Sequence, residues 1–255
     1  MERIRFLDLE THNAVMNMAT DESIMLSVRN GDSPPTLRFY RWSPSAVSIG
    51  TFQGMTEEVD LEFCRASGID YIRRITGGGA VYHDYEGEIT YSIILPRGHG
   101  LVPDDIIESY HNLCGGVVRG LEHLGISAEF KPINDVVANG KKVSGNAQTR
   151  RHSCVLQHGT VLFDLDVKTM FSVLKVPQEK ISDKMIADVR ERVTSVRELL
   201  ERNVTFDELS DALKKGFEEA LGAKLFPGKM TAAEIQTADN IAAERFSKDE
   251  WNLKR

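Results

Sequence analysis

The chain has 255 residues, 41% of them hydrophobic, and a formal net charge of −7 at pH 7. That length and apolar content are enough to bury a substantial core. The charged N-terminus and the lack of any long aliphatic stretch argue against a secretion signal and a membrane span. Three cysteines without a CxxC spacing argue against a disulfide framework and a structural zinc site. We therefore expect a cytoplasmic protein that does not bind membranes.

Strands and helices interleave over the first two thirds of the chain. Alternating apolar residues predict strands at 4–8, 37–39, 47–49, 71–73, 89–95 and 155–163. Helices are predicted at 13–30, 60–67 and 104–124, each followed by a glycine that can end it. After residue 164 the pattern becomes mainly helical, with a capping box at Thr205 that opens a helix to about residue 221 and a further helix at about 231–246. The order predicts an α/β or α+β fold, and without a repeat or a linker we expect one domain over residues 1–255.

The most informative segment covers residues 73–84 and reads RRITGGGAVYHD. Three successive glycines let backbone N–H groups approach a ligand closely, and the adjacent Arg73 and Arg74 add donors for phosphate or carboxylate. It is not a Walker A loop, because no Lys-Ser/Thr follows, and its glycines are not spaced as in the dinucleotide fingerprint. From the residues alone it is either an anion-binding loop or a tight turn with a basic flank.

Residues 134–147 predict a β-hairpin. Val136 and Val137 form one arm, and Asn139-Gly140 is a strong type I′ turn signal. Asp135 on one arm could then lie near Lys142 on the other, although for each residue alone a turn carboxylate or a solvated lysine is the favoured interpretation. Basic pairs at 73–74, 141–142 and 150–151 stand out in an acidic chain. They favour a small anionic ligand over nucleic acid.

These segments resemble the motifs of lipoate–protein ligases, which are related to biotin ligases and class II aminoacyl-tRNA synthetases. The family's Arg-Arg-x-Ser/Thr-Gly-Gly-Gly-Ala-Val-Phe/Tyr-His-Asp motif matches residues 73–84, Asn-Asp-Leu/Val-Val matches 134–137, and Lys-Val-Ser-Gly-Ser/Asn-Ala matches 142–147. A His-His-Gly-Thr-like strand matches 157–162, with Gln157 in place of the first histidine, and a Val-Thr-Ser-Val-Arg-like segment lies at 193–197. The match covers almost the whole chain in the family's order. It implies a mixed, mostly antiparallel sheet flanked by helices.

The resemblance also implies a reaction. An ATP-dependent ligase of this kind activates lipoate as lipoyl-AMP. It then transfers the lipoyl group to a lysine of carrier domains, as in 2-oxoacid dehydrogenase or glycine cleavage complexes. The expected cofactors are ATP and Mg²⁺, with lipoate as the substrate, and the expected partners are the carrier domains.

The resemblance assigns roles at the matching positions. Lys142 is expected to be catalytic and Asp135 to bind Mg²⁺, since magnesium prefers carboxylate oxygen. The expected ATP and adenylate contacts are Arg73, Arg74, Gly77, Gly78, Gly79, Ala80, Val81, Tyr82, Asp135 and Lys142. The expected lipoate contacts are His83, Lys142, Gly145, His158 and Gly159, with Gly159 leaving room for the acyl chain. Arg38 and Arg41 are weaker phosphate candidates, and Met16, Met18 and Met25 are expected in the core rather than in a pocket.

Three other functions compete with the ligase. A biotin ligase would carry a Gly-Arg-Gly-Arg-type loop, which is absent here. An octanoyltransferase of the same fold would use an activated cysteine just before the hairpin or after the Gly-Thr strand. Residues 128–133 and 164–184 contain no cysteine, and we expect Cys154 to be a packed thiol. A non-catalytic module that binds adenylate or carrier would keep the loop but turn over nothing.

The last residues suggest a partner. In fused ligases a Ser-Trp-Glu-Trp-Asn-like segment leads into an accessory C-terminal domain, and residues 246–252 resemble that junction. We therefore expect a single adenylating domain that works with a separate accessory protein. Trp251 is either an exposed docking element for that protein or a residue packed on its own domain.

Overall fold

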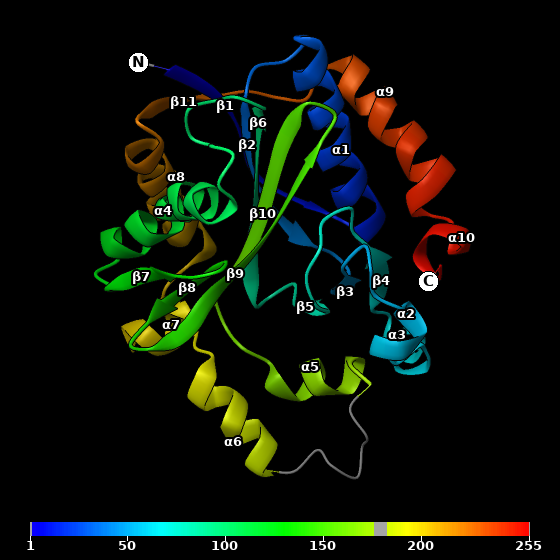
Figure 1. Cartoon of the computed structure of the whole chain (residues 1–255). Helices are drawn as coiled ribbons and strands as arrows, with labels where there is room; N and C mark the ends of the chain where they lie inside the picture. The colour runs from blue at the N-terminus through cyan, green and yellow to red at the C-terminus, as the bar shows by residue number, and fades with distance from the viewer. Residues whose placement is uncertain (1, 176–182, 255) are drawn as a thin grey trace.

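The computed structural model describes residues 2–175 and 183–254 (Figure 1). Over these residues the main sheet has eight strands in the order β11-β1-β2-β6-β10-β9-β8-β7. β1 runs parallel to β11 and β2, and the other neighbouring strands are antiparallel. The strands are β1 (Glu2–His12), β2 (Thr36–Trp42), β6 (Glu88–Pro96), β7 (Ala128–Lys131), β8 (Asp135–Ala138), β9 (Lys141–Arg151), β10 (Cys154–Leu162) and β11 (Ala223–Pro227). The predicted mixed, mostly antiparallel sheet is confirmed.

Helices cover both faces of this sheet (Figure 1). Helices α4 (Ile106–His123) and α8 (Phe206–Leu221) pack together on one face, and α1 (Ala14–Asn30) and α9 (Ala232–Ile241) cover the other. Side chains alternate along β2, so Leu37 and Phe39 enter the α4–α8 core while Tyr40 and Trp42 enter the core under α1. Burial on both faces explains the nearly continuous apolar run in β6, whose residues are buried from Glu88 to Leu95.

A smaller sheet holds the glycine loop. Its strands are β4 (Asp70–Arg73), β3 (Ala46–Ile49) and β5 (Val81–His83), in the order β4-β3-β5. Helices α2 (Met55–Glu58) and α3 (Leu61–Ser67) and the end of α5 (Val167–Val173) contribute to its apolar core. Because β5 leads directly into β6 of the main sheet, the two sheets meet beside the loop at residues 74–80.

The predicted helix ends are largely confirmed. Asn13, Asp60 and Thr205 cap α1, α3 and α8 by accepting a hydrogen bond from a backbone N–H in the first turn. The glycine after each of these helices adopts the left-handed conformation that ends it. Local capping rules were therefore sufficient for these boundaries.

The region after residue 164 departs from the prediction at one strand. β11 lies where only helices were expected, and it pairs in parallel with β1 at the sheet edge, a partner that no local pattern reveals. The predicted helix at 231–246 is α9 followed by a π-helical turn at Ala242–Phe246. The remaining helices are α6 (Asp183–Arg192), α7 (Val196–Leu200) and α10 (Asp249–Asn252). Within the described ranges no helix is both long and apolar enough to cross a bilayer.

Candidate active site

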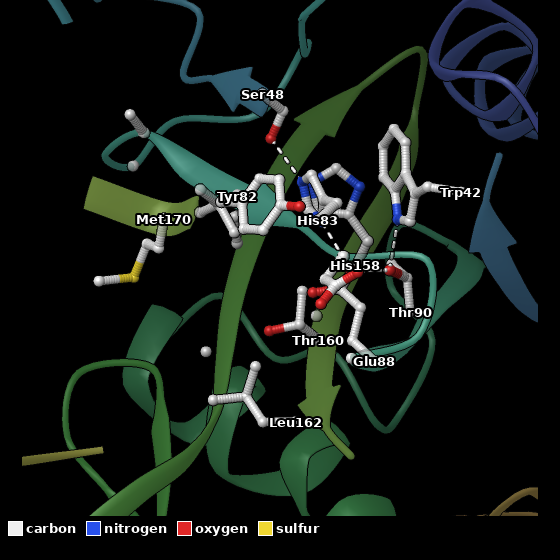
Figure 2. A pocket seen from close by; sticks show the side chains of 18 of the residues that line it. Trp42, Ser48, Tyr82, His83, Glu88, Thr90, His158, Thr160, Leu162 and Met170 are labelled. Carbon is white, nitrogen blue, oxygen red and sulfur yellow. Dashed lines mark hydrogen bonds and ion pairs between the residues drawn. The ribbon is translucent and has the colours of Figure 1, made fainter. Parts of the chain in front are cut away.

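A cavity of about 350 Å³ lies where β9 and β10 of the main sheet meet β5, with α5 beside it (Figure 2). Two of its lining residues, Arg74 and Lys142, are cations. Much of the rest is apolar and includes Leu162, Leu165, Met170, Leu174 and Val193. A concave apolar site with a few converging polar groups is the usual form of a small-molecule site.

The glycine loop forms one wall of this cavity. Gly78, Gly79 and residues 80–83 line it, while Gly77 lies outside the described lining. Gly78 has a φ of +99°, a conformation that side chains strongly disfavour. A Cβ at Gly50 would collide with the carbonyl oxygen of Gly78, so the loop packs directly on β3.

Arg74 holds this loop from inside. Its guanidinium donates to the backbone oxygens of Gly77 (2.8 Å) and Gly79 (2.7 Å), and to both the carbonyl and the hydroxyl of Ser48 (3.1 Å each). Burial lowers the pKa of Arg74 to about 10. Direct contact with phosphate would require Arg74 to exchange some of these bonds, so that role stays a prediction.

Arg73 does not face the cavity, which corrects the expected phosphate contact. It is fully buried and donates to the backbone oxygens of Gly50, Thr51 and Gln53, and to the C-terminal segment at the Trp251 carbonyl (3.0 Å). Neighbouring residues of an extended chain point to opposite sides, so only one of the two arginines can face the ligand. Arg73 instead fastens the C-terminal segment to β4.

The predicted hairpin is confirmed, as is the approach of its two charged residues. Asn139 and Gly140 both have positive φ, as a type I′ turn requires. Lys142 Nζ lies 2.6 Å from Asp135 Oδ1, and its side chain remains 40% exposed. A Cβ at Gly145 would lie 2.7 Å from Lys142 Cε, so this glycine leaves room for the lysine chain. Lys142 is thus a partly solvated cation in the cavity.

Asp135 could offer a metal ion one carboxylate. In the part of the chain that the structure describes, no three His, Cys, Asp or Glu side chains gather as a metal site. Asp135 already holds Lys142, and it is not among the described lining residues. A magnesium ion here would take most of its oxygen ligands from phosphates and water, which suits its chemistry.

Two buried histidines line the cavity (Figure 2). His158 Nε2 is 2.7 Å from Thr76 Oγ1, and its Nδ1 is 3.6 Å from Asp21 Oδ2. Burial lowers the pKa of His158, so this imidazole is neutral at pH 7. His83 bonds to Ser48 and Glu88. Both histidines lie beside the apolar lining, and their contact with lipoate stays a prediction.

Gly159 lies where two buried side chains pack closely against β10. It lines the cavity, but a Cβ there would collide with the Asn146 side chain and lie 2.9 Å from Tyr91 Cε1. Asn146 accepts from Tyr91 Oη at 2.7 Å. The missing side chain therefore makes room for this buried pair, and the contact of Gly159 with an acyl chain stays a prediction.

The three cysteines are buried and free, as expected for Cys154. Burial raises the pKa of the Cys64 thiol to about 11 and that of Cys114 to about 12, and it also raises the pKa of Cys154. No cysteine occurs among the described lining residues of the cavity. None of the three is therefore suited to act as a thiolate nucleophile.

Several secondary expectations need correction. Arg38 is fully buried against Asp21, and Arg41 donates to the Tyr85 carbonyl, so neither arginine lines the cavity. Met25 belongs to the core as expected, but Met18 also lines the cavity. The helix pattern could not distinguish a core position from one beneath a pocket.

Trp251 is packed on its own domain. Its ring lies edge-on to Phe246 at 5.9 Å, and its Nε1 donates to the Arg73 carbonyl at 2.8 Å. Of the two alternatives for Trp251, these contacts support packing on its own domain. The residue instead fixes the C-terminal segment.

A family model described as the lipoyl protein ligase A/B catalytic domain matches residues 13–218. The chain belongs to this family. Among solved structures, a bi-partite lipoate protein ligase from Thermoplasma acidophilum has a TM-score of 0.89 and 36% identity, covering 100% of this chain and 98% of that one. A lipoate-protein ligase A bound with ATP has a TM-score of 0.83 and 35% identity, covering 99% of each chain. The predicted family and fold are confirmed.

Curated relatives within this family carry a different name. Octanoyltransferase LipM of Kyrpidia tusciae is 39% identical and covers 100% of both chains. Octanoyltransferase LipM of Bacillus subtilis is 33% identical and covers 100% of this chain and 99% of the relative. The chain is thus an enzyme of the lipoate ligase and octanoyltransferase family.

Sequence reasoning missed the buried polar residues around the cavity, notably Ser48, Glu88 and Asn146. Each sits in or next to a strand and is buried. The available signal was a polar residue within an otherwise apolar strand, as in Ala46–Ile49. Such residues must find partners: here Ser48 and Glu88 both bond to His83, and Asn146 bonds to Tyr91.

Proposed function

We propose that this chain is an ATP-dependent lipoate–protein ligase. The observation that carries the proposal is the composition of one cavity. The glycine loop, the partly exposed Lys142 and an apolar wall meet in it, whereas all three cysteines are buried elsewhere. Activation of lipoate by ATP needs a loop that binds phosphate, a cation and an apolar pocket. Transfer of an acyl thioester through sulfur instead needs an accessible thiolate.

In the first step a lipoate carboxylate oxygen attacks the α-phosphorus of ATP, and pyrophosphate leaves. The Lys142 ammonium can exchange Asp135 for the two approaching anions because its side chain is partly solvated. Aligning the reactants can lower the barrier by on the order of 7–11 kcal/mol. Cationic stabilisation of the charge that moves onto the leaving group adds to this.

In the second step a carrier lysine amine attacks the lipoyl carbonyl, and AMP leaves. Until then the mixed anhydride must be kept from water. The apolar lining and the neutral His158 suit that task because neither binds water as strongly as a charged group would. Magnesium, held in part by Asp135, would neutralise the phosphates.

The partners follow from the same proposal. The Thermoplasma acidophilum neighbour is described as a bi-partite ligase with an E2 lipoyl domain, and it aligns with this chain over nearly its full length. We propose that residues 1–255 act as one adenylating domain on lipoyl carrier domains, with a separate accessory protein for efficient transfer. The isolated chain should then form adenylate readily and transfer lipoyl to the carrier poorly. Full lipoylation of the carrier by the chain alone would show that no accessory protein is needed, while the proposed ligase activity would stand.

Lipoate-dependent exchange of radiolabelled pyrophosphate into ATP tests the proposal. The ligase predicts exchange that requires both lipoate and Mg²⁺. A non-catalytic module predicts no exchange under any condition. If the protein binds ATP but no pyrophosphate exchange is detected, the proposed ligase activity is wrong.

Octanoyl transfer is the second candidate, and the names of the curated relatives favour it over the ligase. The buried thiols oppose it, because thioester chemistry through sulfur needs an exposed thiolate. An assay with an octanoyl thioester donor and a carrier domain, without ATP, decides between the two. Transfer through a cysteine would make the transferase the function of this chain.

A further inference from the structure

The second step of the proposed reaction needs a group that takes a proton. A lysine acceptor is an ammonium ion at pH 7, and its nitrogen has no lone pair for attack until one proton has left. The cations Arg74 and Lys142 of the cavity cannot accept that proton. A carboxylate or a neutral imidazole in the lining could do so, as general bases in other enzymes do.

Most bases in the lining of the cavity are already engaged. Both ring nitrogens of His83 and of His158 face a polar partner. Glu88 is buried, and its Oε1 accepts from both His83 and Thr90. These groups are therefore tied into the wall of the cavity.

Two further lining carboxylates hold local structure beside α5. Asp166 caps α5 by accepting from the Thr169 N–H at 3.0 Å and from Thr169 Oγ1 at 2.6 Å. Asp164 pairs with Arg197 at 2.8 Å and also accepts from the Leu165 N–H. Neither carboxylate is open to a substrate proton without losing one of these bonds.

Asp84 is the lining carboxylate with an unengaged oxygen. Within the described residues its side chain accepts one hydrogen bond, from the Glu86 N–H to Oδ1 at 3.2 Å. Asp84 is half-buried, so the chain leaves its second oxygen within reach of a molecule that enters the cavity from solvent. This is the position that a base for an incoming amine requires.

The electrostatic surroundings of Asp84 favour the same role. Burial raises the pKa of Asp84, and the nearby carboxylates of Asp166, Glu88 and Glu86 raise it further. A carboxylate with a raised pKa is a more effective proton acceptor. The same negative charges attract an ammonium ion to this part of the cavity.

The strand register places Asp84 across the cavity from Lys142. The end of β10 pairs on one side with Glu88 of β6, which follows the turn that begins at Asp84. On its other side β10 pairs with Ser144 of β9, two residues after Lys142. Two strand spacings, on the order of 10 Å, therefore separate the two segments. An acyl-adenylate bound between them would have a cation on one side and a carboxylate on the other.

Resting on the proposed function, we propose that Asp84 is the catalytic base that deprotonates the acceptor lysine. Its carboxylate takes one proton from the ammonium, and the nitrogen then attacks the lipoyl carbonyl. The C–N bond forms, the C–O bond to the phosphate breaks, and the electron pair leaves with AMP. A second nitrogen proton passes to a phosphate oxygen of AMP, and the third stays on the amide. Asp84 returns its proton to water.

The test supplies prepared lipoyl-AMP to the full chain, so that it does not depend on adenylate formation. The acceptor is N-acetyl-lysine amide, which is small enough to need neither a carrier domain nor an accessory protein. Wild-type protein at pH 7 should form the lipoyl-lysine product faster than the same reagents do in free solution. Asp84→Asn should form it about 100-fold more slowly than the wild type, the usual loss when a general base is removed. Mass spectrometry of quenched samples measures the product.

Hydroxylamine as the acceptor separates catalysis from structure, because it is neutral at pH 7 and needs no base. With hydroxylamine, Asp84→Asn should form lipoyl hydroxamate at nearly the wild-type rate. Glu86→Gln is the matched control. It removes an exposed carboxylate two residues away, outside the described lining, and it should keep both rates.

Three results would overturn the role of Asp84. They are no acceleration by the wild type, wild-type transfer to the lysine amide by Asp84→Asn, and an equal loss with both acceptors. Pyrophosphate exchange is measured separately on the same proteins. Its absence in the wild type would remove the proposed ligase activity, while the experiment with supplied lipoyl-AMP would still decide the role of Asp84.

Discussion

The two cations of the cavity are held in opposite ways. Arg74 is buried, donates four hydrogen bonds to the glycine loop and Ser48, and has a lowered pKa. Lys142 is 40% exposed and paired with a single-charge partner, Asp135, across a hairpin. Because the donors of Arg74 already have partners, this cation holds the shape of the site. Lys142 is partly solvated, so it can exchange Asp135 for a substrate. This difference teaches that burial, more than charge, separates a scaffold residue from a reactive one.

The largest expected effect is on activity at Lys142. Lys142→Ala should lower adenylate formation by about 100-fold or more, because it removes the cation that faces the reacting anions. Stability should change by less than about 0.5 kcal/mol, as for other solvated side chains. Pyrophosphate exchange and thermal unfolding measure the two quantities.

Lys141→Ala is the matched control for that variant. Lys141 Nζ donates to the Arg190 carbonyl and is absent from the described cavity lining. The pyrophosphate exchange activity of Lys141→Ala should equal that of the wild type. Equal activity of Lys142→Ala and Lys141→Ala would remove the distinction between the two lysines.

Arg74→Met should affect stability as well as activity. The substitution leaves carbonyl oxygens of Ser48, Gly77 and Gly79 without this donor, which should cost about 3 kcal/mol. The loop should then lose its shape, and exchange activity should fall with it. Chemical denaturation is the measurement, and unchanged stability together with lost activity would show that Arg74 acts on substrate and not on the loop.

Gly78→Ala should have a smaller effect on folding. A left-handed φ costs an L-residue about 1–2 kcal/mol, and the new Cβ would lie 2.8 Å from Arg74 Nη2. Gly79→Ala is the control, because its Cβ would meet nothing within 4 Å and its φ is not in the left-handed region. Equal unfolding free energies for the two variants would contradict this account of the loop.

The smallest expected effect is a pH dependence from His158. Its folded-state pKa is lowered by burial, so between that value and the ordinary value near 6.5 the unfolded chain binds more protons. Stability should therefore decrease as pH falls from 7 through the folded pKa. His158→Gln should show a shallower decrease in denaturation experiments from pH 7 to pH 5. An identical slope in both proteins would mean that His158 does not titrate on unfolding.

Local rules predicted the parts of the site that depend on backbone conformation. Asn139-Gly140 fixed the hairpin turn, and that turn brought Asp135 to Lys142. The same rules could not separate Arg73 from Arg74, because their motif contains two adjacent cations and only the packed strand shows which one is buried beneath the C-terminal segment.

The remaining parts depend on contacts between distant segments. Ser48, His83 and Glu88 come from three strands, so their assembly follows from register and not from spacing in the sequence. β11 forms because it finds β1 more than two hundred residues earlier in the chain. Sequence pattern gave the motifs and the family resemblance, and tertiary pairing determined which polar residues share the cavity.

Direct detection of lipoyl-AMP tests the central claim. Wild-type protein given ATP, Mg²⁺ and lipoate, without a carrier domain, should accumulate lipoyl-AMP that mass spectrometry identifies after a rapid quench. Lys142→Ala should accumulate almost none. A lipoyl or octanoyl thioester on Cys154, with no adenylate in the wild type, would contradict the account and make this chain a cysteine-dependent transferase.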